Sequence, residues 1–421
     1  MIYVMVKNTV LFGLLIALSC IGPPEKSKNL DSSNEPNQTP TEVENSQEVV
    51  LKLGAERLDA YLPLLKNKGV GLVANPTSTI RTSLNSENSK YTHLVDTLKS
   101  RNVNLKSVFA PEHGFRGIAD AGEHVKDGVD AKTGIPIISL YGENRKPTGD
   151  TLKGIDIMVF DLQDVGVRFY TYISTLHYIM EACAENNIPL IVLDRPNPNG
   201  MYIDGPTLEA VNKSFLGMHE IPLVHGMTIG EYAQMINGEN WLKDSVKCKL
   251  SVITMKNYSH KLPYSLPVRP SPNLPNDQSI KLYPSLGLFE GTNINAGRGT
   301  EEQFQKYGAP YLDKNYFDYR YTPEPNFGSK HPKHEGQVCY GRDLTNLDFK
   351  PHFTLEFIIE AYNHCLEKDK FFLTSGFTKH AGTDKLQKQI VAGMSEKEIR
   401  DTWKADLEKF KTTRAKYLLY D

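Results

Sequence analysis

Several short motifs that would assign this chain of 421 residues to a common functional class are missing from it. Its five cysteines form no Cys-x-x-Cys pair and its histidines no His-x-x-x-His pair, so we expect no metal site. No apolar run is followed by Gly-x-Gly-x-x-Gly, which disfavours a dinucleotide cofactor, and no Gly-x-Ser-x-Gly marks a serine hydrolase. We therefore expect no cofactor. Four cysteines lie in apolar contexts that favour buried free thiols over disulfides, namely Cys183, Cys248, Cys339 and Cys365.

The chain also lacks an excess of charge of one sign and a long apolar run. Its 48 basic and 50 acidic residues give a net charge of −2, which argues against a general nucleic-acid binder. No stretch reaches the roughly 18 consecutive apolar residues of a membrane span. Apolar residues make up 39% and charged residues 23% of the chain, enough for a sizeable core, and the length suggests two domains.

The first twenty residues predict a targeting signal that is not part of the fold. Lys7 precedes a short apolar segment at residues 10–18, which fits a signal peptide. The sequence Ala17–Leu18–Ser19–Cys20 resembles a bacterial lipobox, so we expect Cys20 to be lipidated and the protein to be anchored in a bacterial cell envelope, at the periplasm or the outer membrane. Ordinary cleavage near Ser19 is the alternative. Residues 21–48 are polar and Pro-rich and predict a flexible linker.

From residue 49 onwards, apolar runs alternate with segments of helical periodicity. One such segment has Ile173, Leu176, Met180 and Ala184 at intervals of three and four residues, which predicts an amphipathic helix. Strands are expected at residues 69–75, 105–110, 135–140, 155–161, 188–194 and 250–255. Nearly continuous apolar strands between helices imply a largely parallel sheet covered on both faces. We predict a Rossmann-like α/β domain over residues 49–265.

Beyond about residue 265 the sequence changes in character. Five prolines crowd residues 263–275, which excludes a helix or a central strand there. A Gly-rich loop and a Tyr-rich region at residues 311–335 follow. Near the end, Ser395 as N-cap and Glu398 at the capping-box position predict a helix that continues through Trp403 to Phe410. We predict a smaller α+β domain over residues 266–421.

The most informative segment follows the expected strand at residues 105–110. It reads Pro111–Glu112–His113–Gly114–Phe115–Arg116–Gly117. Ligands bind outside the carboxyl ends of strands in open α/β sheets. A carboxyl group at that place, next to His113 and Arg116, is a candidate for proton transfer. The other interpretation is a turn with a solvated Glu112, and spacing alone does not decide between the two.

Two other expected strand ends and one loop carry polar clusters. Residues 161–172 contain Asp161 and Asp164, each of which is a candidate general base or nucleophile, or a helix cap or arginine partner. Residues 194–200 follow the next strand. The Gly-rich segment 290–300 lacks the lysine of a Walker motif. Its asparagines and arginine suit a sugar and its carboxylate, because arginine pairs with planar carboxylates through two hydrogen bonds.

Together, these motifs resemble one family. In order, they are residues 71–77, 111–117, 139–142, 161–172, 194–198, 271–275, 290–300 and 381–384. Their order, from about residue 50 to the terminal Tyr417–Leu418–Leu419–Tyr420, is similar to that of the exo-β-N-acetylmuramidases, peptidoglycan hexosaminidases once catalogued as a domain of unknown function. Residues 311–335 match least.

This resemblance implies release of terminal N-acetylmuramic acid from the non-reducing end of peptidoglycan fragments, in a cleft between the two domains. Glu112 matches the family's proposed catalytic glutamate and would be the acid, with Asp164, Glu290 or the substrate's own acetamido group as the second group. Candidate partners of the lactyl carboxylate are Arg116, Arg168 and Arg298. The other candidate binding residues are Asn75, His113, Asp161, Tyr170, Arg195, Asn273, Asn293 and Asn295. The alternative function is a lipid-anchored protein that captures muropeptides without cleaving them.

Overall fold

A central sheet of seven strands organises the N-terminal part of the computed structural model, which describes residues 50–82, 90–116 and 127–421. Its strands are β1 Val70–Ala74, β4 Leu105–Ala110, β5 Gly128–Val129, β6 Pro136–Ser139, β7 Ile157–Asp161, β8 Leu190–Leu193 and β9 Leu250–Ile253. They lie in the order β5-β6-β4-β1-β7-β8-β9, and only the β5–β6 pair is antiparallel. The predicted largely parallel sheet is confirmed, and each predicted strand contains an observed one.

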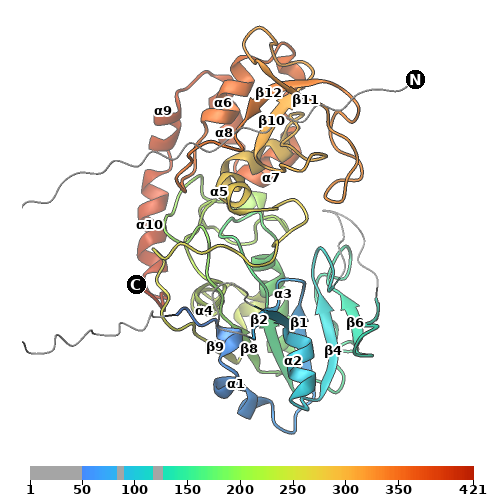
Figure 1. The fold of residues 1–421 in the computed structure, drawn as a ribbon. Helices are drawn as coiled ribbons and strands as arrows, with labels where there is room; N and C mark the ends of the chain where they lie inside the picture. Colours follow the sequence, from blue (N-terminus) through green and yellow to red (C-terminus); the bar gives the residue numbers. More distant parts are fainter. Residues whose placement is uncertain (1–49, 83–89, 117–126) are drawn as a thin grey trace, which may run out of the picture. The chain divides into compact units, whose positions relative to one another are not determined.

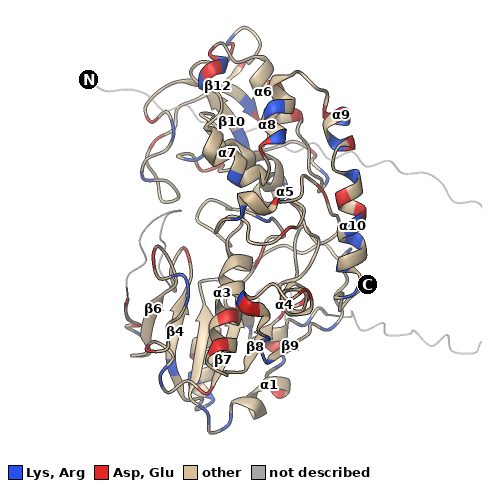
Figure 2. Ribbon diagram, turned by 180° about the vertical axis from the view of Figure 1, so that it is seen from behind, with Lys and Arg blue, Asp and Glu red and all other residues tan. Residues whose placement is uncertain are grey.

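Helices cover both faces of this sheet, as predicted. Neighbouring residues of one strand enter different cores: Phe160 of β7 belongs to the larger core, and Val159 to the smaller one. Figure 1 shows α2 in front of the sheet, and Figure 2 shows α3 and α4 from behind. The helices of this part are α1 Leu58–Leu65, α2 Leu94–Ser100, α3 Tyr172–Glu185 and α4 Ile229–Gly238. A separate hairpin joins β2 Thr79–Arg81 to β3 Tyr91–His93.

The C-terminal part combines a small antiparallel sheet with six helices in the described residues. Its strands, β10 Lys306–Ala309, β11 Tyr319–Tyr321 and β12 Cys339–Asp343, lie in the order β10-β12-β11. The helices are α5 Asp277–Leu286, α6 Glu356–Asn363, α7 Thr374–Ala381, α8 Lys385–Val391, α9 Glu396–Asp401 and α10 Lys404–Arg414. Short 3₁₀ helices lie in both parts of the chain. They are Gly54–Glu56, Ala210–Asn212 and Lys243–Ser245 in the N-terminal part, and Gly287–Gly291 and Lys368–Lys370 in the C-terminal part. The predicted α+β character is confirmed.

The last helical segment differs from the sequence prediction in one respect. Ser395 and Glu398 form the predicted capping box at the start of α9. The helix does not continue to Phe410, because Trp403 (φ −110°, ψ 4°) interrupts it and α10 begins at Lys404. The bend lets the indole of Trp403 pack in the core, 6.3 Å from the ring of Phe353. Basic and acidic residues are interspersed along α9 and α10 (Figure 2).

The end of the chain docks on the N-terminal part. Helix α10 runs towards β9 in Figure 1, and Arg414 donates hydrogen bonds to the carbonyl oxygen of Gly226. The hydroxyl of Tyr420 donates to Oδ2 of Asp194 at 2.6 Å, and the hydroxyl of Tyr417 donates to Glu239 at 2.7 Å. Residues 49–421 therefore form one compact unit.

Two further sequence predictions can be placed on the structure. Cys183, Cys248, Cys339 and Cys365 are buried free thiols, as predicted. None of the helices in the described residues has both the length and the apolar character that crossing a membrane requires. The signal peptide, the lipidation of Cys20 and the linker at residues 21–48 lie outside the described residues.

Candidate active site

Polar side chains gather at the carboxyl edge of the large sheet, as predicted. Asn75 follows β1, Glu112 is the second residue after the end of β4, and Arg195 follows β8. A cavity of about 90 Å³, here called the central cavity, opens at this edge. Its polar and aromatic lining comes from both parts of the chain and comprises Glu112, His113, Tyr170, Thr171, Ser271, Asn273, Tyr283, Glu290, Arg298 and His380.

Glu112 is held in place within the central cavity. The backbone turns sharply after β4, because His113 adopts the left-handed region (φ 72°), which is costly for a residue with a side chain. The hydroxyl of Thr171, at the start of α3, donates a hydrogen bond of 2.8 Å to Oε2 of Glu112. A merely solvated turn residue would have no such bond. Glu112 is a positioned carboxyl group in a cavity.

Two tyrosines from the start of α3 form a wall beside Glu112. The aromatic rings of Tyr170 and Tyr172 contact each other edge to face, with their centroids 4.8 Å apart. The hydroxyl of Tyr170 donates to the carbonyl oxygen of Pro270 at 2.5 Å, and Asn75 donates from Nδ2 to the hydroxyl of Tyr172 at 2.7 Å. Burial raises the pKa of both tyrosines, so both are neutral at physiological pH. Asn75 thus orients this wall.

Glu290 brings a second carboxyl group to the central cavity. It belongs to the 3₁₀ helix Gly287–Gly291, and Nη1 of Arg298 donates to its Oε1 at 3.1 Å. Burial alone would raise the pKa of Glu290. The nearby basic groups Arg298, His380 and Lys333 outweigh burial and hold the pKa of Glu290 below the usual value. Glu290 is therefore ionised over the physiological range.

A second, cationic cavity of about 320 Å³ adjoins the first and shares Glu290 and Arg298 with it. Lys333 lines it and donates from Nζ to the carbonyl oxygens of Phe289, Glu290 and Thr292. Burial lowers the pKa of Lys333 to about 8. The loop is also braced by Asn295, which donates to the carbonyl oxygens of Arg298 and Lys333, and by Asn293, which donates to that of Lys370.

Asn273 is a buried polar side chain that stands out in the central cavity. It lines the central cavity and is only 3% exposed. Neither its Oδ1 nor its Nδ2 has a hydrogen-bond partner within the part of the chain that the structure describes. A buried amide left unpaired costs about 1–3 kcal/mol, so such a group indicates a place for a polar ligand.

Arg168 does not line the central cavity, so the structure gives no support to its predicted contact with substrate. Its side chain is completely buried. Nη1 donates to the carbonyl oxygens of Pro206 and Ile221 at 2.7 and 2.9 Å, and Nη2 to those of His380 and Ala381 at 3.0 and 2.7 Å. Burial lowers the pKa of Arg168 to about 9. Arg168 joins the two parts of the chain.

Asp161 and Arg195 also have a structural role. They form a buried ion pair with hydrogen bonds of 2.6 and 2.9 Å, which confirms arginine pairing as the interpretation of Asp161. Asp164 accepts a hydrogen bond of 2.7 Å from the backbone of Gly166 and does not line the central cavity. Neither aspartate caps α3, whose N-cap is Thr171.

Arg116 lines a third cavity, here called the apolar cavity, of about 400 Å³. It forms ion pairs with Asp96 at 2.7 Å and Asp130 at 3.0 Å. The apolar cavity shares His113 and Ser271 with the central cavity.

Tyr283, Thr171 and His380 line the central cavity but were not predicted from the sequence. Burial and the charges of Glu290 and Glu112 raise the pKa of Tyr283, which lies near both carboxyl groups. Nδ1 of His380 lies 2.9 Å from the carbonyl oxygen of Gly376, so Nδ1 carries the proton and Nε2 is an acceptor. His380 immediately precedes the motif at residues 381–384, a signal that could have identified it. Thr171 lies within the motif at residues 161–172, whereas Tyr283 has no comparable signal.

Comparison with known proteins decides the family. The model described as exo-β-N-acetylmuramidase NamZ, N-terminal, matches residues 70–278, and its C-terminal counterpart matches residues 281–420. The chain belongs to the exo-β-N-acetylmuramidase NamZ family. The resemblance found in the sequence is thereby confirmed.

Relatives of known sequence or structure match most of the chain. Peptidoglycan β-N-acetylmuramidase NamZ of Bacillus subtilis (strain 168) is 41% identical over 382 residues, which cover 86% of this chain and 89% of that protein. A DUF1343 family protein of Bacteroides fragilis NCTC 9343 has a crystal structure that is 44% identical, with a TM-score of 0.80, covering 88% of this chain and 99% of its own. A second DUF1343 structure from the same strain is 30% identical, with a TM-score of 0.75. The match covers 89% of this chain and 100% of that one. These two DUF1343 proteins thus share the fold over nearly their whole length.

Proposed function

We propose that this NamZ family member is a peptidoglycan β-N-acetylmuramidase, a glycoside hydrolase that releases N-acetylmuramic acid from the non-reducing end of peptidoglycan fragments. The observation that carries the proposal is 41% identity, over most of both chains, to a protein named for that activity. A cavity with two carboxyl groups, Glu112 and Glu290, agrees with it, because glycosidases act through such pairs.

Glu112 is the proposed general acid. Cleavage of a glycosidic bond needs a proton on the leaving oxygen while positive charge develops on the sugar ring. Thr171 fixes the orientation of the Glu112 carboxyl group through its hydroxyl. A positioned acid avoids the cost of reorientation during the reaction.

Glu290 is the proposed second carboxylate in preference to Asp164. It lines the same cavity as Glu112, whereas Asp164 does not. Its lowered pKa keeps it ionised, as a base, a nucleophile or a stabiliser of the oxocarbenium charge must be. The substrate's acetamido group remains the alternative nucleophile, with Glu290 then stabilising the charge.

Arg298 is the proposed partner of the lactyl carboxylate that distinguishes N-acetylmuramic acid from N-acetylglucosamine. It lines both the central and the cationic cavity, beside Lys333. Arg168 donates to four backbone carbonyl groups and Arg116 is paired with two aspartates, whereas Arg298 is paired with one carboxylate, Glu290, within the cavity itself. The unpartnered amide of Asn273 suits the polar acetamido group of the sugar.

The experiment that tests the function is incubation with a disaccharide that has N-acetylmuramic acid at its non-reducing end. The expected product is free N-acetylmuramic acid, identified by mass spectrometry, and the disaccharide of inverse sequence serves as control. Protein that binds the first disaccharide without cleaving it would contradict the proposal and favour the alternative of a muropeptide-binding protein.

We also propose that the protein is a lipoprotein of the cell envelope that acts in cell-wall turnover. The proposal rests on the sequence around Cys20, and the linker at residues 21–48 would reach about 30 Å on average. Cys20→Ser should move the protein from the membrane fraction to the soluble fraction without loss of activity. A Cys20→Ser protein that stays in the membrane fraction would contradict the anchor.

A further inference from the structure

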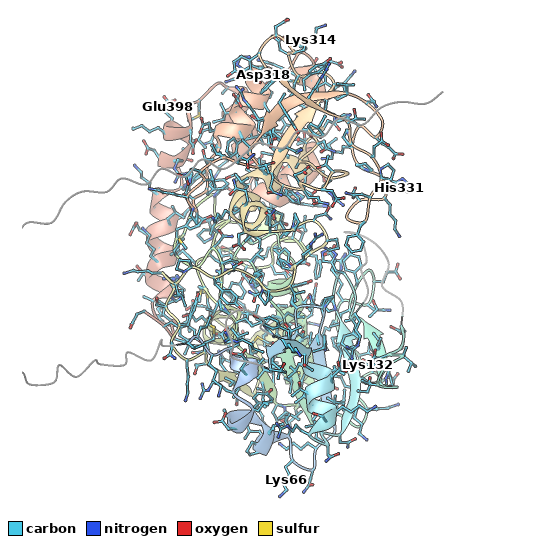
Figure 3. The ribbon with its side chains drawn as sticks, in the orientation of Figure 1. Lys66, Lys132, Lys314, Asp318, His331 and Glu398 are labelled. Carbon is cyan, nitrogen blue, oxygen red and sulfur yellow. The ribbon has the colours of Figure 1, made fainter. Side chains whose placement is uncertain are left out.

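An exposed aromatic side chain lies at the tip of a hydrogen-bonded turn next to the apolar cavity. Phe327 is 48% exposed and lies in the loop between β11 and β12. The turn closes through two backbone hydrogen bonds between Asn326 and Ser329, of 2.9 and 3.2 Å. His331, labelled in Figure 3, marks the position of this loop.

The side chain of Asn326 fixes this turn. Its Oδ1 accepts hydrogen bonds from the backbone of Gly328 and Ser329 at 3.1 and 3.0 Å. Its Nδ2 donates at 2.8 Å to the carbonyl oxygen of Thr300, at the end of the loop that carries Arg298. The backbone that carries Phe327 is therefore fixed while its side chain is exposed, an arrangement that suits ligand binding more than core packing.

Phe327 faces the apolar cavity. Val268, Pro270 and Pro272 from the Pro-rich segment line this cavity together with Phe327. Because His113 and Ser271 also line the central cavity, the apolar cavity begins next to Glu112.

The chemistry of the proposed reaction determines what this cavity receives. The acid protonates the oxygen that joins the released sugar to the leaving sugar, so both sugars must lie next to Glu112. The lactyl carboxylate of the released sugar suits the cationic cavity with Arg298 and Lys333. Two arginines, Arg116 and Arg269, line the apolar cavity, and the charge of Arg116 is already balanced by Asp96 and Asp130.

We infer that the apolar cavity is the subsite for the leaving N-acetylglucosamine, and that Phe327 stacks on the face of its ring. The inference rests on the proposed function and assigns a residue that determines specificity for the leaving group. A pyranose ring presents a face of C–H groups, which packs on an aromatic ring as other apolar groups do.

The test compares two substrates that differ only in the leaving group. One is the disaccharide of N-acetylmuramic acid and N-acetylglucosamine, and the other is β-N-acetylmuramyl fluoride, whose leaving group has no ring. Phe327→Ala should lower kcat/KM for the disaccharide about tenfold, mainly through KM, the scale of one lost aromatic contact. It should leave kcat/KM for the fluoride unchanged, and Phe327→Trp should restore the disaccharide reaction. Leu366→Ala, which removes another exposed apolar side chain outside the three cavities, is the matched control.

The outcomes separate this inference from the function on which it rests. Wild-type protein that cleaves neither substrate overturns the proposed function, and the inference with it. If the wild type cleaves both and Phe327→Ala lowers both rates equally, or neither, the inference alone is overturned. A loss seen only with longer fragments that carry stem peptides would also overturn it, because the cavity would then hold peptide.

Discussion

The hydroxyl of Thr171 lies 2.8 Å from Oε2 of Glu112 and donates a hydrogen bond to it across 59 residues of sequence. Thr171 is also the N-cap residue of α3, whose apolar residues belong to the larger core. The carboxyl group that follows β4 is thus oriented by the first turn of a helix that follows β7. The ends of the two strands that flank β1 therefore act together.

Thr171→Val should weaken catalysis without unfolding the protein. Valine keeps the shape of threonine but cannot donate to Glu112, so the carboxyl group loses one constraint. A hydrogen bond of this kind contributes about 0.5–1.5 kcal/mol, so kcat for the disaccharide should fall by up to about tenfold with little change in KM. Thr171→Ser should restore the rate. Equal kcat for wild type and Thr171→Val would show that the bond does not serve the reaction.

Glu112→Gln should abolish most activity on the natural disaccharide. Glutamine keeps the size of the side chain but cannot act as a carboxylic acid, and general acid catalysis contributes typically about 10²–10⁴-fold. The loss should be smaller for a nitrophenyl glycoside, whose leaving group departs without a proton. Equal losses on both substrates would make Glu112 a base or nucleophile and Glu290 the better candidate acid.

Arg298→Ala and Arg168→Ala should have opposite consequences. Arg298→Ala should reduce the preference for muramyl over glucosaminyl substrates by about tenfold or more, because a charge-assisted bond contributes about 1.5–3 kcal/mol. Its unfolding free energy should fall less than that of Arg168→Ala, because Lys333 remains beside Glu290. Arg168→Ala removes four hydrogen bonds to backbone carbonyl groups and should lower the unfolding free energy by about 3 kcal/mol or more. Substrate competition and urea denaturation measure the two effects. An Arg298→Ala variant with full discrimination would disprove the lactyl contact.

Affinity for the muramyl substrate should fall as the pH rises through about 8. Lys333 loses its proton near that pH, so the cationic cavity loses one positive charge. KM for a muramyl glycoside should therefore rise above pH 8, whereas KM for the glucosaminyl analogue, which lacks the carboxylate, should not. Lys333→Met should remove the step. Parallel pH profiles for the two substrates would contradict the assignment.

The same pKa has a defined consequence for stability. The pKa of Lys333 is lower in the folded protein than its ordinary value of 10.5, so the unfolded chain binds more protons between pH 8 and 10.5. The contribution of Lys333 to the unfolding free energy therefore rises with pH in that window. The difference in unfolding free energy between the wild type and Lys333→Met should follow this trend.

Asn273→Ala should weaken binding of the acetamido sugar. The amide of Asn273 has no partner among the described residues, so its removal costs the free protein little. Loss of its bond to the substrate should raise KM about three- to tenfold, the scale of a neutral hydrogen bond. A substrate with a free amine in place of the acetamido group should show a smaller effect. An unchanged KM for both would exclude Asn273 from recognition.

Local patterns in the sequence predicted the sheet and part of the site. The apolar run at residues 105–110 forms a strand, and Pro111 marks its end. The position of Glu112 follows from that end. The role of Arg168 could not be predicted in the same way. Its acceptors are backbone carbonyl groups 38 to 213 residues away, and backbone acceptors have no sequence signature. The break at Trp403 likewise depends on a distant core contact with Phe353.

The bonds of Arg168 have a consequence for attempts to divide the protein. The two family models meet between residues 278 and 281, a natural place to cut a gene into two fragments. A fragment ending at residue 278 would bury an arginine whose acceptors at residues 380 and 381 are on the other fragment. This fragment would also lose the hydrogen bond from Tyr420 to Asp194. Neither fragment should accumulate alone, whereas co-expression should let each serve as the folding template of the other.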